Sequence, residues 1–326
     1  MKKVFKDLKF KDMLSLWISS KNISRKDLII RLQRKYHNVF FGLDTITFSR
    51  WINGKSTPPL YKQLYIAKCL DINLQDVIRC LDVSMLKCPN SHAVIARGLV
   101  KELDYSLSAL SYNHMPKNII TEISDHSYDE HIELFGAFYG NLSPLKSFTN
   151  SLYEMRNKIT YKSILIKNNQ DEVIGHWAGI MNIAKINNLS SFISIPQNEV
   201  ESSCLGYLGY YSNSKHYFEL ITQSICMYLI LYSKSKDFVY FFIVDNNALV
   251  KFCTIIFNAE VIKYYPSLEG QGTMGVYLLK FNIIKSIANP LLLPKVQEKL
   301  SCLETCDSKN CKLCNLRDLE LRKGKK

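Results

Sequence analysis

Four cysteines lie close together near the C-terminus, in the segment CLETCDSKNCKLC. They are Cys302, Cys306, Cys311 and Cys314, all within thirteen residues. Thiolates this close can bind a zinc ion tetrahedrally, and a metal stabilises the fold of a segment too short to form its own core. The C-x-x-C half has zinc-site spacing, whereas the spacing of the first three cysteines is unusual for a zinc knuckle. We therefore expect zinc, with an iron–sulfur cluster, a redox disulfide or metal-free thiols as alternatives.

A second group of polar residues lies in LDTITFSRWINGKSTPP, residues 43–59. Asp44 can cap a helix that begins at Thr45, and Asn53-Gly54 can end it in the left-handed conformation. Residues at three- and four-residue spacing would form its buried face, namely Phe48, Trp51 and Ile52. The face left for contact with another molecule would carry Thr45, Ile46, Ser49, Arg50 and Asn53.

The charge of the chain is concentrated at its two ends. The formal net charge is +13, and residues 1–85 hold 16 Lys and Arg against 7 Asp and Glu, a net charge of +9. Residues 286–326 add +4, which leaves the middle neutral. Basic charge concentrated in a small segment indicates contact with a polyanion, of which nucleic acid is the first candidate. The chain has no membrane-spanning apolar run, and MKKVFKDLKFKD lacks a signal-peptide core, so we expect a cytoplasmic protein.

The polar helix needs neighbours that hold it in place. Capping and turn residues predict five helices, at about Phe10–Ser20, Ser24–Tyr36, Thr45–Asn53, Leu60–Leu70 and Leu74–Leu81. The succession ISRKDLIIRL, TFSRWINGKSTPP and YIAKCLDINLQDVI resembles the helix-turn-helix domain of the lambda-repressor-like (XRE/Cro) family over roughly residues 10–82. The linker HNVFFGLD, between the second and third helices, is longer and more apolar than the turn of that family.

This resemblance implies binding of double-stranded DNA, with the third helix in the major groove and a homodimer on a two-fold site. Thr45, Ile46 and Arg50 would read bases, because Thr and Ile suit a thymine methyl group and Arg suits guanine. The same surface would contact the DNA backbone and flanking groups through Ser24, Arg25, Thr47, Ser49, Asn53 and Lys55. The alternative is a helical protein-interaction module in which Arg50 is only a solvated charge.

The middle of the chain mixes helices and strands after a connecting helix at residues 91–111. We expect a strand at Ile119–Ile123, helices at about Tyr128–Tyr139 and Leu145–Asn157, and a hairpin that turns at Asn168–Asp171. The elements expected next are the strand CLGYLGYY, a helix at Lys215–Tyr232, the strand FVYFFIVD, a helix at Asn247–Phe257, and strands at Val261–Tyr265 and Val276–Phe281. This order predicts an α+β domain with a largely antiparallel sheet.

The order β-α-α-β-β-β-α-β-α-β-β resembles the GNAT N-acetyltransferase fold over roughly residues 117–284. The closest local likeness is VDNNALVKFCTIIFNAEVIKYY, where Asn258 stands at the family's helix-ending glycine and can adopt the same left-handed conformation. Acetyl-CoA binding in the family uses a Q/R-x-x-G-x-G/A loop, whose small residues let pyrophosphate approach the backbone. Here that loop reads SNSKHYFELI, with Lys215 in the basic position and Phe218 and Leu220 replacing the small residues.

The catalytic residues match the family less well than the order of elements does. Thr254 falls where the family has a Tyr acid, and Thr cannot protonate a thiolate at neutral pH. His176 and Glu219 remain as acid–base groups, although a single His beside Trp177 is more often structural. We therefore expect a non-catalytic sensor or dimerisation domain. A small-molecule or acyl ligand would contact Lys215, Tyr210 and Tyr211.

We thus expect a multidomain chain. Its parts are a helix-turn-helix domain (1–85), a helical connector (86–116), a degenerate GNAT-like α+β domain (117–285) and a Cys-rich basic tail (286–326) that ends in a frayed RDLELRKGKK. The predicted function is a sequence-specific DNA-binding transcriptional regulator. One alternative is a DNA-associated N-acyltransferase that uses acyl-CoA. Another is a repressor of the phage or mobile-element type, in which the second domain only dimerises.

Overall fold

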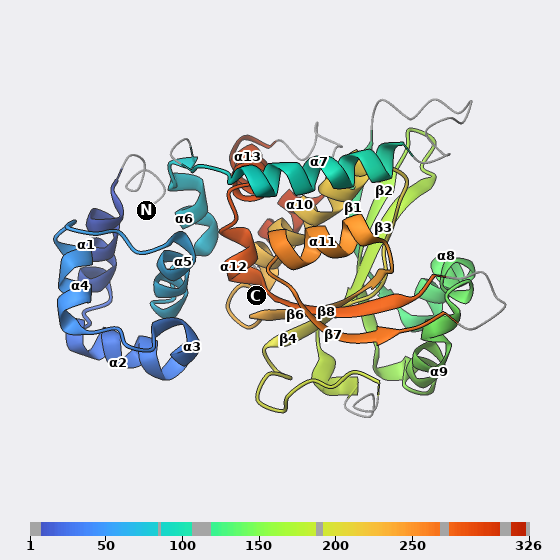
Figure 1. The fold of residues 1–326 in the computed structure, drawn as a ribbon, viewed down its shortest axis with the longest axis horizontal. Coiled ribbons are helices and arrows are strands. Elements are labelled where there is room, and N and C mark those ends of the chain that lie inside the picture. The colour runs from blue at the N-terminus through green and yellow to red at the C-terminus, as the bar shows by residue number, and fades with distance from the viewer. Residues whose placement is uncertain are drawn as a thin grey trace.

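The computed structural model describes residues 8–83, 86–105, 119–186, 192–267, 274–306 and 314–323. These residues form a small helical domain and a larger α+β domain, and helix α7 (Asn90–Asp104) runs from the first across the second (Figure 1). Within these ranges, no helix combines the length and the apolar character that crossing a bilayer requires.

The helical domain contains all five predicted helices and one more. Its helices are α1 (Phe10–Ser20), α2 (Arg25–Lys35), α3 (His37–Phe40), α4 (Thr45–Ile52), α5 (Leu60–Cys69) and α6 (Leu74–Cys80). Each predicted boundary agrees within one residue, whereas α3 lies in the linker for which no element was predicted. Phe40 of α3 is fully buried, so this linker contributes to the core of the domain.

Side-chain caps fix the first turns of α2 and α4, as the sequence predicts. The Ser24 hydroxyl accepts a hydrogen bond from the Asp27 amide, and the Asp44 carboxylate accepts one from the Thr47 amide at 2.6 Å. Each cap satisfies an amide that has no partner within its helix, a contribution of about 1 kcal/mol. Gly54 follows the C-terminal end of α4 and has a φ of +68°, the left-handed conformation that the sequence predicts there.

The second domain is built on one mixed sheet. Its described strands are β1 (Ile120–Ser127), β2 (Thr160–Lys167), β3 (Val173–Ile180), β4 (Ser203–Gly206), β5 (Tyr210–Tyr211), β6 (Phe238–Val244), β7 (Glu260–Tyr265) and β8 (Val276–Asn282). The order across the sheet is β1-β2-β3-β4-β6-β8-β7, and β5 pairs with β3. Of these described pairs only β4 and β6 are parallel. The predicted order is confirmed, except that CLGYLGYY is divided into β4 and β5.

Alternate residues of the strands face two separate cores. On one face lie α8 (Tyr128–Gly140), α9 (Lys146–Glu154) and the short 3-10 turns Ser143–Leu145 and Arg156–Lys158. On the other lie α10 (Ser214–Leu231), α11 (Asn247–Ile256), α12 (Ile283–Ile287), α13 (Leu293–Thr305) and α14 (Leu316–Lys323). In β6, for example, Phe241 belongs to the second core, whereas Tyr240 and Phe242 belong to the first. Asn258, which follows α11, has φ +52°, as predicted.

The C-terminal residues are part of this fold. Leu316 and Leu319 of α14 are buried, and the Asn315 side chain bonds both the amide and the carbonyl of Ile123 at 2.8 Å. The expectation of a frayed end is therefore wrong for residues 317–323, because two leucines anchor their helix against α10.

The two domains share a buried interface. The Lys68 ammonium of α5 forms an ion pair with Asp237 at 2.8 Å and also donates to the Lys236 carbonyl at 2.9 Å. Helix α5 packs against α12, and α6 packs against α10 and α13. The Gln297 amide of α13 donates to the carbonyls of Ile78 and Leu81 at 2.8 and 2.7 Å, at the C-terminal end of α6. The helical domain is therefore fixed to the sheet domain by specific polar contacts.

Candidate nucleic-acid interface and sheet cavity

The exposed face of α4 brings most of the predicted DNA-contacting residues together. One hollow in the surface is lined by Thr45, Ile46, Ser49, Arg50, Asn53 and Lys55. Ile46 is 64% exposed although it is apolar, and Arg50 is also exposed. The Asn53 side chain donates to the Ser49 hydroxyl at 3.2 Å. An exposed apolar side chain beside hydrogen-bonding groups and a cation matches the mixture of groups at the edges of base pairs.

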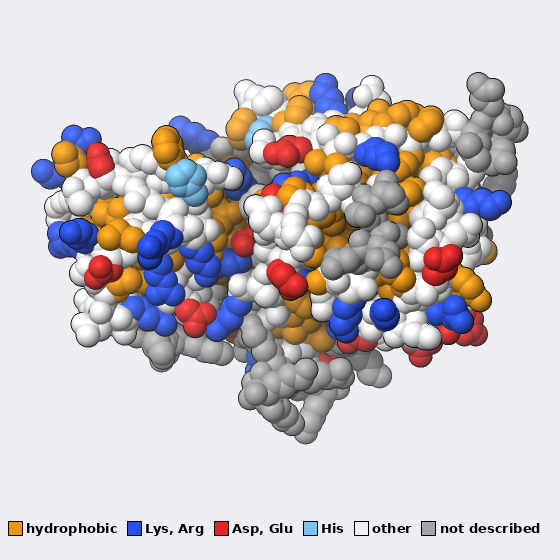
Figure 2. Space-filling view, turned by 90° about the horizontal axis from the view of Figure 1, so that it is seen from below, with side chains coloured by type: hydrophobic (Ala, Val, Ile, Leu, Met, Phe, Trp, Pro, Cys, Tyr) orange, Lys and Arg blue, Asp and Glu red, His pale blue; other side chains and the backbone are white. Residues whose placement is uncertain are grey.

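The opposite face of α4 holds the helix in position. Phe48 and Trp51 are buried, with their rings 5.9 Å apart, and α4 packs against α1 and α2. The remaining predicted residues lie close to helix starts: Ser24 and Arg25 are exposed at the start of α2, and Thr47 is half-buried in the first turn of α4. Figure 2 shows Lys and Arg side chains gathered on one face of the helical domain.

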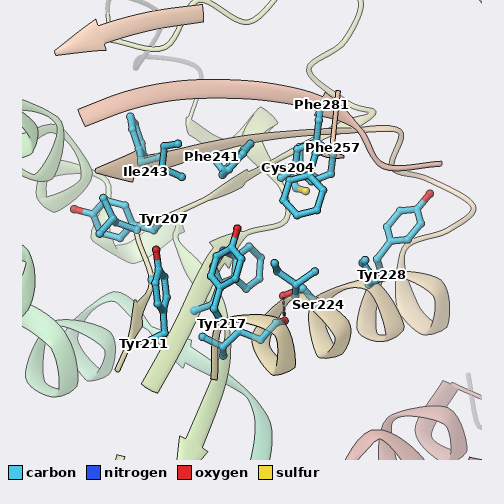
Figure 3. Close-up of a pocket in the computed structure, with 18 of the residues that line it drawn as sticks. Cys204, Tyr207, Tyr211, Tyr217, Ser224, Tyr228, Phe241, Ile243, Phe257 and Phe281 are labelled. Carbon is cyan, nitrogen blue, oxygen red and sulfur yellow. Dashed lines mark hydrogen bonds between the residues drawn. The ribbon is translucent and has the colours of Figure 1, made fainter. Parts of the chain in front are cut away.

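A cavity of about 330 Å³ lies where strands β4 and β6 separate. The two strands pair from Ser203 to Gly206, after which the chain leaves β6 and pairs with β3 at Tyr210 and Tyr211. Helix α10 closes the space that this divergence leaves (Figure 3). Every described residue that lines the cavity is uncharged, and most are aromatic or aliphatic.

The tyrosines around the cavity differ in where their hydroxyl groups point. Figure 3 shows the hydroxyls of Tyr207 and Tyr228 directed outward and those of Tyr211 and Tyr217 directed toward β6. The Tyr207 hydroxyl bonds Thr149 at 2.8 Å, and the Tyr228 hydroxyl donates to the Lys236 carbonyl at 2.9 Å. Burial raises the pKa of Tyr211, so it stays a neutral phenol at physiological pH. Of the three residues predicted to contact a ligand, Tyr210 and Tyr211 line the cavity and Lys215 does not.

The N-terminus of α10 is the place where the GNAT resemblance puts a phosphate-binding loop. There the Asp104 carboxylate of α7 accepts hydrogen bonds from the Ser214 amide and the Ser214 hydroxyl, both at 2.7 Å. Glu102, two residues earlier in α7, accepts one from the side-chain amide of Asn246, the cap of α11, at 3.3 Å. The Asp104 carboxylate thus occupies a backbone donor at the start of α10, where an anion is favoured. This contact could not be predicted from sequence patterns, because 110 residues separate Asp104 from Ser214.

The two candidate acid–base groups are engaged elsewhere. His176 is buried, its ring stacks on Phe135 at 3.9 Å, and burial lowers its pKa to about 3, so it remains neutral. Glu219 forms an ion pair with Lys299 at 2.8 Å, and its pKa is lowered because the charge of Lys299 and hydrogen bonds outweigh the effect of burial. Neither residue lines the cavity.

The structure describes three of the four predicted metal ligands. Cys311 lies outside the described residues, whereas Cys302 is exposed and Cys306 and Cys314 are half-buried. In the described ranges, no group of three or more His, Cys, Asp or Glu side chains is placed to hold a metal ion. The zinc site therefore stays a prediction, since one of its four ligands is not described.

Comparisons with known proteins yield similarities to two acetyltransferase structures. NAA60 of Arabidopsis thaliana, in complex with acetyl-CoA, is similar over 50% of this chain and 98% of its own, with 13% identity and a TM-score of 0.32. A chimera of the spermidine N-acetyltransferase SpeG from Vibrio cholerae and hSSAT is similar over 49% of this chain and 80% of its own, with 12% identity and a TM-score of 0.28. No family model and no curated protein matches the sequence.

Proposed function

We propose that the chain is a sequence-specific DNA-binding transcriptional regulator that acts as a homodimer, with a GNAT-like domain that does not transfer acetyl groups. The observation that carries this proposal is the hollow on α4, which unites six of the residues selected from the sequence for DNA contact. The net charge of +9 in residues 1–85 supports it further, because neutralising phosphates supplies much of the affinity for DNA.

The non-catalytic role rests on three features of the second domain. The Ser214 donors at the start of α10 bind Asp104, the cavity between β4 and β6 has an uncharged lining, and His176 is buried and neutral. A CoA pyrophosphate would have to displace Asp104 from the Ser214 donors, and neither His176 nor Glu219, the acid–base groups selected from the sequence, is among the described residues that line the cavity. The domain is therefore better suited to binding a ligand than to acyl transfer.

Selection from a pool of random duplexes tests this function directly. The full chain is expected to enrich one sequence, and its affinity should fall steeply with salt as condensed counterions are released. Failure to enrich any sequence would leave the helical domain as a protein-interaction module. Acetyl-CoA turnover by the same preparation would instead support the alternative function, a DNA-associated N-acyltransferase that uses acyl-CoA.

A further inference from the structure

The cavity between β4 and β6 has properties that restrict what it can hold. Its volume is about 330 Å³, at the lower end of the range of small-molecule pockets. No Lys, Arg, His, Asp or Glu side chain is among the described residues that line it. A charged molecule would lose its hydration there without gaining a counter-ion, which is strongly unfavourable. A neutral, mainly apolar molecule would lose little and would bury its surface.

The lining offers polar groups to such a molecule, and the Tyr211 hydroxyl is the one that Figure 3 shows directed toward β6 without a partner in the described part of the chain. The Tyr211 hydroxyl has no hydrogen-bond partner among the described residues, whereas Tyr207 and Tyr228 have theirs. The neighbouring Tyr217 hydroxyl contacts the Cys253 sulfur at 3.9 Å, a weak interaction. Tyr211 and Tyr217 therefore form a polar position on a wall that is mainly aromatic and aliphatic (Figure 3).

The cavity wall is also connected to the helical domain. Tyr228 lines the cavity, and its hydroxyl donates to the Lys236 carbonyl at 2.9 Å. The same carbonyl accepts a bond from Lys68 of α5 at 2.9 Å, and Lys68 continues to Asp237 at 2.8 Å. A second connection runs through α12, because Ile283 and Ser286 line the cavity and α12 packs against α5.

From these contacts we infer that the cavity binds a small, uncharged, mainly apolar molecule with one hydrogen-bonding group, and that Tyr228 and the Lys236 carbonyl transmit its presence to α5. This inference rests on the proposed role of the domain as a sensor. Tyr211 is the residue that selects the ligand's polar group, and Tyr228 is a positioning residue that links the cavity to the helical domain. A coupling of this kind requires that the ligand stabilises one arrangement of α5 more than another.

Calorimetric titration of the full chain with three bicyclic probes tests the ligand class. The probes are indole, indene, which lacks the N–H group, and indole carboxylate, which adds a charge. Indole should bind at one site, about fivefold more tightly than indene because of one hydrogen bond, and indole carboxylate should not bind. Tyr211→Phe should remove the difference between indole and indene. Equal affinity for all three probes, or no binding of indole, would overturn the inference.

A matched pair of substitutions locates the binding site. Ser224 lines the cavity and its hydroxyl bonds only the Leu220 carbonyl of its own helix, so Ser224→Phe should fill the space and weaken indole binding at least tenfold. Ser151 of α9 makes the same kind of bond to Ser147 but does not line the cavity, so Ser151→Phe should bind as wild type. Unchanged binding by Ser224→Phe would place the probe elsewhere and contradict the assignment.

Hydrogen exchange tests the connection without any DNA. Indole should slow amide exchange in Leu60–Cys69 relative to α8, on the other face of the sheet. Tyr228→Phe removes the hydroxyl that donates to the Lys236 carbonyl, so at a concentration of indole that saturates this variant the slowing in α5 should be clearly smaller than in wild type. The same slowing in Tyr228→Phe would refute the route. These measurements use no DNA, so the two proposals can be told apart. A chain that binds DNA but not indole would contradict only the ligand inference. A chain that binds indole but not DNA would contradict only the proposed regulatory function.

Discussion

The hollow on α4 and the cavity between β4 and β6 are two candidate sites of opposite kinds. The first is an exposed polar surface on a single short helix, and its residues lie within eleven positions of one another, from Thr45 to Lys55. The second is a largely apolar space formed by β3, β4, β6, α10 and α12, whose residues are spread over much of the chain. Local spacing can reveal the first kind of site, whereas for the second the sequence indicated only Tyr210 and Tyr211, and the folded chain reveals the remaining lining residues.

The buried link between the two regions should have the largest effect on stability. Asp237→Asn would leave the Lys68 ammonium, 3% exposed, without its counter-charge, at an expected cost of about 3–5 kcal/mol. Asp71→Asn is a matched control, because Asp71 forms an ion pair with Lys234 that is 2.8 Å long but exposed and should contribute only about 0–1 kcal/mol. Urea unfolding measures both. Equal effects would mean that the helical domain is not anchored through Lys68.

Acidification should weaken the sheet domain through two buried histidines. Burial lowers the pKa of both His131 and His176 to about 3, from 6.5 for an exposed histidine. Between pH 6.5 and 3 the unfolded chain binds protons at these sites and the folded chain does not, so the free energy of unfolding falls as the pH falls. The expected loss is about 1.4 kcal/mol per histidine per pH unit. Unfolding curves from pH 7 to 5 measure it.

His131 offers a control for this pH effect. Its two ring nitrogens have no hydrogen-bond partner, and its ring stacks on Tyr161 at 3.8 Å. His131→Phe keeps the aromatic stacking and removes one titrating group, so the pH dependence of the unfolding free energy should decrease by one histidine's share, about 1.4 kcal/mol per pH unit. A pH dependence that is the same in His131→Phe and wild type would assign it to other groups.

The Asp104 contact should have a smaller effect on stability but a clear consequence for ligand binding. Asp104→Ala removes a carboxylate from two Ser214 donors and from the start of α10, at an expected cost of about 1–2 kcal/mol. Because Phe218 and Leu220 still replace the small residues of the phosphate loop, the variant should bind no acetyl-CoA. Calorimetry with acetyl-CoA checks this, and binding by the variant alone would show that Asp104 is an autoinhibitory plug.

The predicted zinc site can be tested by measuring the metal content of the purified chain. If Cys302, Cys306, Cys311 and Cys314 share one ion, the purified chain should carry about one zinc with sulfur ligands near 2.3 Å, and Cys311→Ser should lose it. Mass spectrometry for metal and alkylation for thiols decide between the alternatives. Metal-free protein with four rapidly alkylated cysteines would remove the zinc prediction.

How much the sequence could reveal depended on how local each feature is. The start of α4 at Thr45, its cap Asp44 and its buried pair Phe48 and Trp51 follow from spacing within one helix, and all agree with the structure. The order of strands was also predictable, because the period of apolar residues changes from helix to strand. Helix α3 was missed because four residues are too few to show a period.

Features that depend on distant contacts were not predictable. The division of CLGYLGYY follows from β3, which takes Tyr210 and Tyr211 as partners in place of β6. The position of α14 is held by Asn315, whose hydrogen-bond partner Ile123 lies 192 residues away in the sequence. Lys215 was selected as a ligand contact by alignment with a phosphate loop, but it is exposed on α10 outside the cavity.

The most direct test of the proposed function compares three arginine substitutions on two duplexes, one selected by the protein and one scrambled. Arg50→Ala should weaken binding to the selected duplex by about 1–3 kcal/mol and leave the scrambled one almost unchanged, because a base contact is lost. Arg25→Ala should weaken both, and Arg97→Ala, an exposed arginine of α7, should weaken neither. Fluorescence anisotropy measures all six affinities. If Arg50→Ala binds both duplexes as wild type does, α4 does not read DNA, and the proposed function is wrong.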